Sequence, residues 1–232
     1  MNRVGHKLLT IIMGGMLVIS MFFVGREAAR YTWGNNVQAE QSCVVIDAGH
    51  GGDDPGKIGI NDALEKEINL KIAFLVKGYL EQNDVKVIMT RETDAGLYDS
   101  GASNKKVQDM KRRLAIIEEA KPSVTVSIHQ NSYPEEYVHG AQVFYYNTSK
   151  EGKKLAESIQ TQFVKQVDPE NKRQIKANDS YYLLKKTATP IVIVECGFLS
   201  NREEAEKLCQ EDYQEKTAWA IYMGIIRYLN DK

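Results

Sequence analysis

Short apolar runs alternate along the chain with longer segments whose apolar residues recur every three or four positions. The short runs are bounded by Gly, Asn, Asp and other polar residues and are typical of buried strands. The longer segments predict amphipathic helices, as where Ile68, Ile72, Leu75 and Tyr79 share one face. The predicted strands span 44–48, 85–90, 124–128, 140–146, 181–185 and 191–195, and the predicted helices span 64–82, 107–120, 150–167, 202–210 and 213–229.

This alternation predicts an α/β fold. We expect a single three-layer domain, with a mostly parallel twisted sheet of about six strands covered by helices on both faces. The part of the chain that begins at Cys43 has about 190 residues, the size of one domain. Two long connections, 91–105 and 131–139, follow or flank strand ends and are expected to contact substrate.

The chain starts with a segment of a different kind. Residues 8–25 carry no charge and follow Arg3, His6 and Lys7. A positive region followed by an apolar core predicts a signal peptide or an N-terminal membrane anchor over residues 1–25. Residues 26–42 then form a polar tether, and residues 43–232 form the catalytic domain. Small residues at 37–39 suit a signal peptidase but lie well beyond the apolar core, so cleavage and anchoring both stay open. Both predict that the domain is exported.

Composition narrows the classes of partner. The net charge is −1 and the pI about 6.5, which argues against nucleic acid and against an anionic membrane surface. We therefore expect membrane contact only through the N-terminal segment. Three cysteines do not make a disulfide framework, and Cys43 and Cys196 border apolar strands as small hydrophobic residues. Cys196 follows Glu195 along a strand, so the two side chains should point to opposite faces.

Four polar residues occupy comparable positions in the predicted fold. His50, His129 and Glu195 each follow an apolar strand, and Glu65 opens a helix. Side chains at the carboxyl ends of parallel strands converge on one crevice. Two histidines and one carboxylate can hold zinc with a position left for water, and a glutamate beside that water can act as a general base. The pattern predicts a zinc-dependent hydrolase.

Each carboxylate also has a structural alternative. Asp62 and Glu65 are spaced as in a helix N-terminal capping arrangement, which would leave Glu65 without a catalytic part. Glu195 could be held by helix amides or by an arginine instead of acting as a base. From the residues alone, both alternatives stay open.

Other polar and aromatic residues have two interpretations as well. Arg91 and Arg113 could orient a carboxylate of the substrate or form structural ion pairs. Tyr181 and Tyr182 could stack on a sugar or belong to the core. His139 lies in a loop and is expected to face solvent.

Five motifs, taken in order, resemble one known family. They are DAGHGG, EKEIN, TRETD, VSIHQNS and VECGFLSN, and the resemblance covers residues 44–229. Together they are similar to the N-acetylmuramoyl-L-alanine amidases of the Amidase_3 type. The resemblance implies one zinc ion held by His50, Glu65 and His129, with Glu195 as the catalytic residue. It therefore favours Glu65 as a metal ligand over Glu65 as part of a helix cap.

The resemblance also implies a substrate and a place. Its substrate would be a peptidoglycan glycan strand with its peptide stem, cut between N-acetylmuramic acid and L-alanine. The short single-domain form resembles family members that act on the spore cortex during germination, a step toward muramic-δ-lactam. This implies the forespore or cortex compartment and allows for an accessory or activating protein. The alternatives are a zinc peptidase that cuts within the stem and a non-catalytic cell-wall-binding module.

Overall fold

The computed structural model describes residues 13, 15–16, 20–21, 24 and 42–231 of the chain. The chain divides between Gln41 and Ser42 into two units, of which the second holds the α/β domain. Most of the predicted signal or anchor, and all of the predicted tether except Ser42, lie outside the described residues. Within the described part of the chain, no helix combines the length and the apolar character that crossing a bilayer requires.

The second unit is built on one sheet of six strands in the order β2-β1-β3-β6-β4-β5. The strands β1, β3 and β6 at its centre are parallel, and only the pair of β4 with β6 is antiparallel. The predicted mostly parallel sheet is confirmed. The strands are β1 (Cys43–Ala48), β2 (Lys86–Met89), β3 (Val124–Asn131), β4 (Gln142–Tyr145), β5 (Lys176–Ala177) and β6 (Ile191–Phe198).

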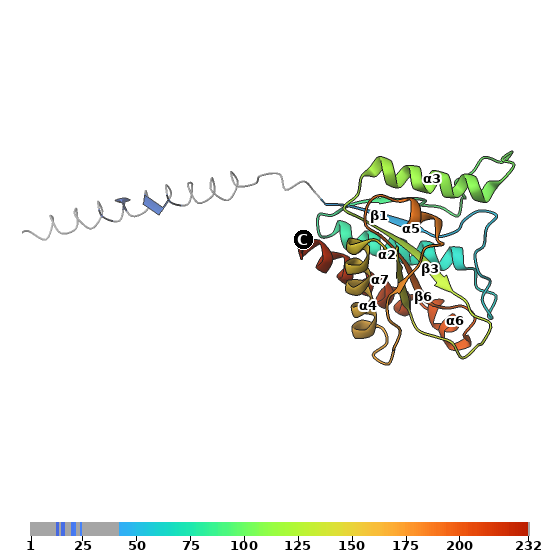
Figure 1. The fold of residues 1–232 in the computed structure, drawn as a ribbon. Coiled ribbons are helices and arrows are strands. Elements are labelled where there is room, and N and C mark those ends of the chain that lie inside the picture. Colours follow the sequence, from blue (N-terminus) through green and yellow to red (C-terminus); the bar gives the residue numbers. More distant parts are fainter. Residues whose placement is uncertain (1–12, 14, 17–19, 22–23, 25–41, 232) are drawn as a thin grey trace, which may run out of the picture. The chain divides into compact units, whose positions relative to one another are not determined.

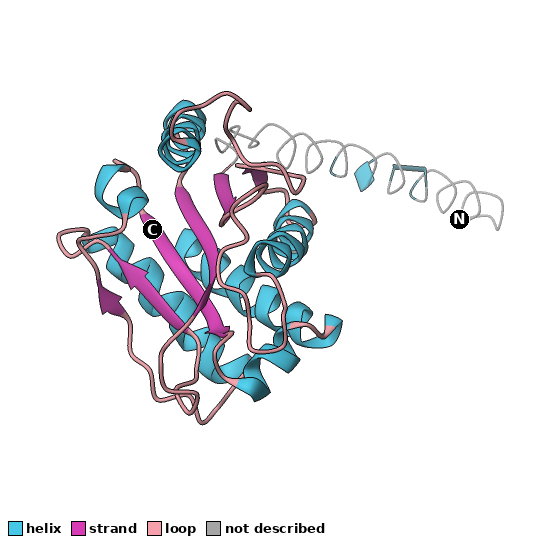
Figure 2. Cartoon of the chain, turned by 90° about the vertical axis from the view of Figure 1, so that its right-hand side faces the viewer, coloured by secondary structure: helices cyan, strands magenta, loops and turns pink. Residues whose placement is uncertain are grey.

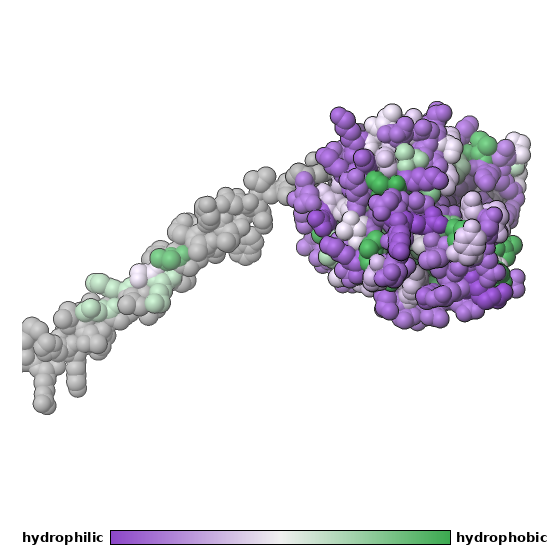
Figure 3. Space-filling model, turned by 60° about the horizontal axis from the view of Figure 1, so that its bottom comes forward, coloured by the Kyte–Doolittle hydropathy of each residue, from purple (hydrophilic) through white to green (hydrophobic). Residues whose placement is uncertain are grey.

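Helices cover both faces of this sheet, as predicted. Helices α2 (Glu65–Glu81), α4 (Lys150–Gln166) and α7 (Glu211–Asn230) pack together on one face, and α3 (Lys105–Ala120) and α5 (Tyr182–Lys186) lie on the other (Figures 1 and 2). Helix α6 (Arg202–Leu208) contacts β6 and α7. On the side of the domain seen in Figure 3, the surface is mostly hydrophilic and its apolar residues form small separate patches.

Alternation along the central strands separates an apolar face from a functional face. Val44, Ile46 and Ala48 of β1 belong to the larger core, which includes the buried residues of α2, α4 and α7. Val45 belongs to the smaller core beneath α3 and α5, and Asp47, two residues on, shares its side of the strand. The same alternation directs Ser127 and His129 of β3, and Ile193 and Glu195 of β6, toward α3 and α5.

One predicted element is wrong. Residues 181–185 were expected as a short strand, but Tyr182–Lys186 form the helix α5. Five residues do not distinguish a strand from a helix by periodicity. The helical turn places the side chains of Leu183 and Leu184 together in the smaller core. In a strand, these two neighbouring side chains would point to opposite faces. The two-residue strand β5 was not predicted, whereas the remaining elements agree with prediction to within a few residues.

Candidate metal and catalytic site

The turn after β1 presents the first histidine in an unusual backbone conformation. His50, Gly51 and Gly52 have φ angles of 63°, 136° and 59°. A left-handed φ is uncommon for a residue other than glycine and is often found at functional sites. Arg113 Nη2 donates a hydrogen bond of 2.6 Å to the carbonyl oxygen of His50 and so holds this turn. A Cβ on Gly49 would lie 2.2 Å from His129 Cε1, so only glycine lets the second histidine ring pack here.

Glu65 is the first residue of α2, and its side chain does not cap the helix. The N-cap residue is Leu64, which makes no side-chain capping bond, so the capping alternative drawn from Asp62 is wrong. Glu65 Oε2 accepts a hydrogen bond of 2.7 Å from the amide of Lys57. Glu65 Oε1 accepts one of 3.1 Å from the amide of Gln130. These bonds fix a carboxylate that is only 3% exposed.

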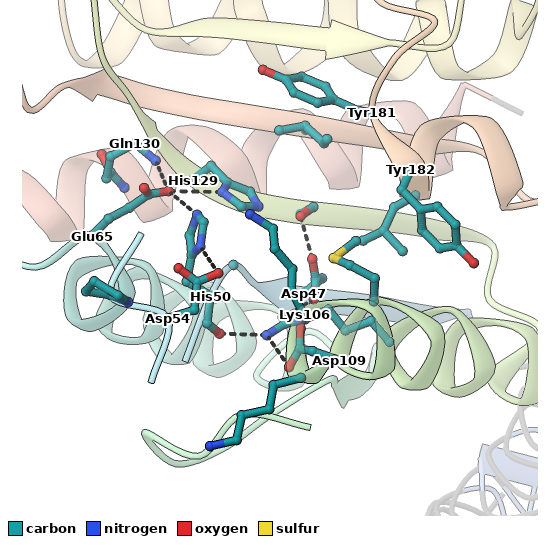
Figure 4. A pocket seen from close by; sticks show the side chains of 18 of the residues that line it. Asp47, His50, Asp54, Glu65, Lys106, Asp109, His129, Gln130, Tyr181 and Tyr182 are labelled. Atoms are coloured by element: carbon teal, nitrogen blue, oxygen red, sulfur yellow. Dashed lines mark hydrogen bonds and ion pairs between the residues drawn. The ribbon is translucent and has the colours of Figure 1, made fainter. Parts of the chain in front are cut away.

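The three residues predicted as ligands converge on one point. Glu65 Oε1 lies 3.2 Å from His50 Nε2 and 3.0 Å from His129 Nδ1. All three ligand atoms lie within 4.8 Å of one another (Figure 4). Ligand atoms about 2.1 Å from a tetrahedral ion are about 3.4 Å apart. The spacing and the donor types, two imidazole nitrogens and one carboxylate oxygen, therefore fit zinc.

Further polar groups orient these three side chains. Asp54 Oδ2 lies 3.0 Å from His50 Nδ1, which leaves Nε2 of the same ring facing the site. Asn69 Nδ2 donates to Glu65 Oε1 at 3.3 Å, and Gln130 Nε2 donates to Asn69 Oδ1 at 3.1 Å. Carboxylates that hold the second nitrogen of a ligating histidine are a common part of zinc sites. Sequence reasoning missed Asp54, although a carboxylate four residues after His50 in the same turn was an available signal.

The charges in this cluster are strongly coupled. Burial alone would lower the pKa of His50, but hydrogen bonds and charge from Glu65 and Asp54 outweigh it and raise that pKa to about 9. Burial alone would raise the pKa of Glu65, but the two histidines hold it well below its ordinary range. The two imidazoles that lower the pKa of Glu65 are therefore the same groups that could ligate a metal.

Glu195 lies on β6, the strand next to β3, and so lies beside His129. Its backbone pairs with that of His129 across β3 and β6. The residue is 7% exposed, and its Oε2 has no hydrogen-bond partner among the described residues. Burial raises the pKa of Glu195 to about 7, although the nearby His129 opposes the rise. In the described part of the chain, no arginine or helix amide donates a hydrogen bond to Glu195. The structural alternative for this carboxylate is therefore not supported.

The two arginines that could have bound substrate have structural contacts instead. Arg91 donates to the carbonyl oxygens of Ala48, Gly49 and Lys66 at 2.9, 3.0 and 2.7 Å. Arg113 Nη1 forms a buried ion pair of 2.7 Å with Asp47. Both guanidinium groups hold the chain around the turn at His50. The predicted structural ion pair is confirmed for Arg113, whereas among the described residues Arg91 is held by backbone carbonyl oxygens instead.

The site opens into a cavity of about 680 Å³ between α3 and α5. Tyr181 and Tyr182 both line it. Tyr181 also packs against the smaller core, edge-on to Phe144, so the core interpretation holds in part for Tyr181. Tyr182 is exposed. Tyr181 is half-buried, and burial together with the charge of Glu195 raises the pKa of its hydroxyl to about 12. A cavity of this volume suits a small ligand or a short piece of a polymer.

Two further predictions concern residues away from the site. Cys196 is fully buried in the larger core, on the opposite side of β6 from Glu195, as predicted. His139 is exposed, also as predicted. The cysteines are all free thiols; Cys43 is half-buried and Cys209 exposed.

The arrangement can hold one divalent cation with a base at its side. His50, Glu65 and His129 supply three ligand atoms from three separate elements, which leaves a fourth tetrahedral position for water or substrate. Glu195 supplies a carboxylate near that position with a pKa suited to proton transfer near neutral pH. This is the composition of a metal-dependent hydrolase.

Comparison with known proteins points the same way. The family model Amidase_3, described as N-acetylmuramoyl-L-alanine amidase, matches residues 44–227. A germination-specific N-acetylmuramoyl-L-alanine amidase of Bacillus subtilis is 34% identical over 97% of this chain and 96% of its own length.

Solved structures share both the fold and part of the sequence. The CwlD amidase from Clostridioides difficile, determined in complex with the GerS lipoprotein, is 40% identical over 83% of this chain and 100% of its own, with a TM-score of 0.81. The amidase AmiC2 of Nostoc punctiforme is 34% identical over 82% of this chain and 97% of its own, with a TM-score of 0.71.

Proposed function

This chain belongs to the Amidase_3 family of N-acetylmuramoyl-L-alanine amidases, and from that premise we propose that it cuts peptidoglycan with one zinc ion. His50, Glu65 and His129 hold the zinc, and Glu195 is the general base. The bond hydrolysed is the amide between the lactyl group of N-acetylmuramic acid and L-alanine. The observation that supports this proposal most directly is the convergence of His50, Glu65 and His129, each of which offers one ligand atom within 4.8 Å of the other two.

The chain's own residues account for the proton transfers. Bound zinc would supply Lewis acidity that polarises the scissile carbonyl and acidifies water. Glu195 accepts a proton from the attacking water and then returns one to the leaving L-alanine amine. Its burial beside His129 suits both steps, because a carboxylate with a pKa near neutral both accepts and releases a proton readily.

Digestion of peptidoglycan tests this function. Mass spectrometry of muropeptides is expected to show glycans with bare lactyl groups and intact stem peptides, and a chelator should abolish the reaction. Cleavage within the stem would instead identify a zinc peptidase. Binding without any cleavage, with zinc present, would identify a wall-binding module.

A substitution tests the base separately from the metal. Glu195→Gln is expected to keep zinc and to lower the turnover by about 10²–10⁴-fold, the range for removal of a general base. Zinc content is measured by elemental analysis beside the activity. Turnover near that of the wild type would remove Glu195 from this role.

We also propose that the substrate is the spore cortex. Support comes from similarity to the germination-specific amidase of Bacillus subtilis and to CwlD, which was solved with a lipoprotein. The protein would then act outside the cytoplasm, with a lipoprotein as a possible accessory partner, on the way to muramic-δ-lactam. Incubation with purified cortex peptidoglycan and zinc should yield stem-free muramic acid, and equal action on vegetative peptidoglycan would contradict this specificity.

A further inference from the structure

Three basic side chains line the cavity, and two of them are committed to other contacts. They are Lys105, Lys106 and Arg113. Arg113 is buried against Asp47, Asp109 and backbone carbonyls. Lys105 forms an ion pair with Asp53 at the rim. Among the described residues, no carboxylate lies within ion-pair distance of the ammonium of Lys106.

Lys106 stands close to the reaction centre. It is the second residue of α3, one turn before Met110, which also lines the cavity. Figure 4 shows its side chain extending from α3 toward His50 and His129. Asp54 is occupied by His50 Nδ1 and by the amide of Gly56, so it leaves the ammonium available to another anion.

The cavity has an excess of negative charge, so a cationic side chain without an ion pair matters for the binding of an anionic ligand. Six acidic residues line it against three basic ones. This excess of negative charge repels an anionic ligand unless a cationic side chain lies next to the negatively charged group of the ligand. The zinc of the proposed function would offset part of the excess. Of the described lysines and arginines that line the cavity, Lys106 is the one without an ion pair. The wall opposite α3 includes apolar side chains, Leu183 and Ile193. Anion recognition is therefore expected on the α3 side.

We propose that Lys106 is a specificity-determining residue that binds a free carboxylate of the peptide stem. The inference rests on the proposed amidase function, because it takes the stem peptide as the ligand. Stem peptides carry free carboxyl groups beyond the alanine at the scissile bond. One extended residue spans about 3.3–3.6 Å, so a carboxylate one or two residues along the stem remains within the cavity. Lys106 would distinguish stems with a free carboxyl from stems in which it is amidated.

A matched pair of substrates tests this role. Both are N-acetylmuramyl peptides, one with a free carboxyl group on the residue after L-alanine and one with that group amidated. For Lys106→Ala, the KM for the free acid is expected to rise about three- to tenfold, with kcat within twofold of the wild type. The KM for the amide should stay unchanged, and Lys106→Arg should restore most of the preference. The control is Lys111→Ala on the same helix, because Lys111 is exposed and does not line the cavity.

Two results would overturn the proposal. One is an equal rise in KM for both substrates, which would indicate a general effect on the cavity wall. The other is a wild-type enzyme that does not favour the free acid. If the wild type cleaves neither substrate, the proposed function fails, and calorimetric binding of the two peptides to Glu195→Gln with and without Lys106→Ala still decides the role of Lys106. Unequal zinc content among these variants would also contradict the proposal, because the change in KM could then come from loss of zinc.

Discussion

At the residue scale, the two histidines contribute in different ways. His50 presents Nε2 to the site and His129 presents Nδ1, and both nitrogens lie near the same oxygen of Glu65. Among the residues that the structure describes, a carboxylate contacts the other ring nitrogen of His50 alone, and that carboxylate belongs to Asp54. A contact of this kind fixes the tautomer and raises the basicity of the ring. We therefore expect Asp54 to contribute to metal affinity without touching the metal.

Substitution of Asp54 tests this contribution. Asp54→Ala should weaken zinc binding about 10–100-fold, the usual cost of losing such a partner. The control is Asp53→Ala, which removes the neighbouring carboxylate that pairs with Lys105 at the rim. Competition with a chromophoric chelator measures both affinities. Equal affinities for the two variants would contradict a role for Asp54 in orienting His50.

The pKa of Glu195 predicts how the activity depends on pH. A general base works in its deprotonated form, so kcat/KM should rise as the pH increases through that pKa. Burial raises the pKa of Glu195 from an ordinary 4.5 to about 7. A nearby cation favours the carboxylate, so the acidic limb is expected between these two values.

The profile must be measured with zinc content followed at every pH, because loss of zinc in acid would give a similar limb. A kcat/KM that stays constant down to pH 4.5 while zinc remains bound would show that Glu195 is not the titrating base.

At the element scale, close packing of helices supports the sheet that carries the site. Gly224 of α7 faces α4, where an added Cβ would lie 2.6 Å from Ile159 Cα. Ser158 of α4 also donates a hydrogen bond of 2.8 Å to the carbonyl oxygen of Gly224. The two helix backbones are therefore in near contact, and a side chain at this position would force them apart.

Two glycine substitutions separate packing from helix propensity. Gly224→Ala should lower the free energy of unfolding by about 1–3 kcal/mol through overpacking. Gly78→Ala on α2 should raise it by up to about 1 kcal/mol, because no atom lies within 4 Å of the new Cβ and alanine favours the helix. Urea unfolding measures both. A Gly224→Ala variant as stable as the wild type would show that α7 moves away at little cost.

At the scale of the whole molecule, the candidate metal site joins distant parts of the chain. Its ligands come from the turn after β1, from the first turn of α2 and from β3. The buried pair of Arg113 and Asp47 links α3 to the same region of the sheet. A metal ion bound only by the folded state would therefore stabilise the domain as a unit.

Zinc should accordingly raise the midpoint of thermal unfolding. At a free concentration 100 times its Kd, the added stability is about 2.7 kcal/mol. For a domain of this size each kcal/mol corresponds to about 2–4 °C, so a rise of about 5–10 °C is expected. His129→Ala lacks one ligand and should lose most of this rise. An equal shift in that variant would place the zinc elsewhere.

Much of the fold could be predicted from local patterns in the sequence. Strands and helices were readable because burial on a strand or helix imposes a period on the residues. The four residues predicted for the site share one signal: three follow parallel strands, whose carboxyl ends meet at one edge of the sheet, and Glu65 opens a helix. The ordered motifs around His50, Glu65, His129 and Glu195 also indicate the family from the sequence alone.

Other features depend on distances that a linear pattern does not contain. Arg113 and Lys106 belong to the same helix and carry the same charge, yet Arg113 is held by Asp47 while Lys106 remains available in the cavity. Residues 182–186 form a helix rather than a strand because packing beside α3 places both Leu183 and Leu184 in the smaller core. Whether a polar side chain has a structural or a functional role depends on which groups lie within contact distance of it in the folded protein.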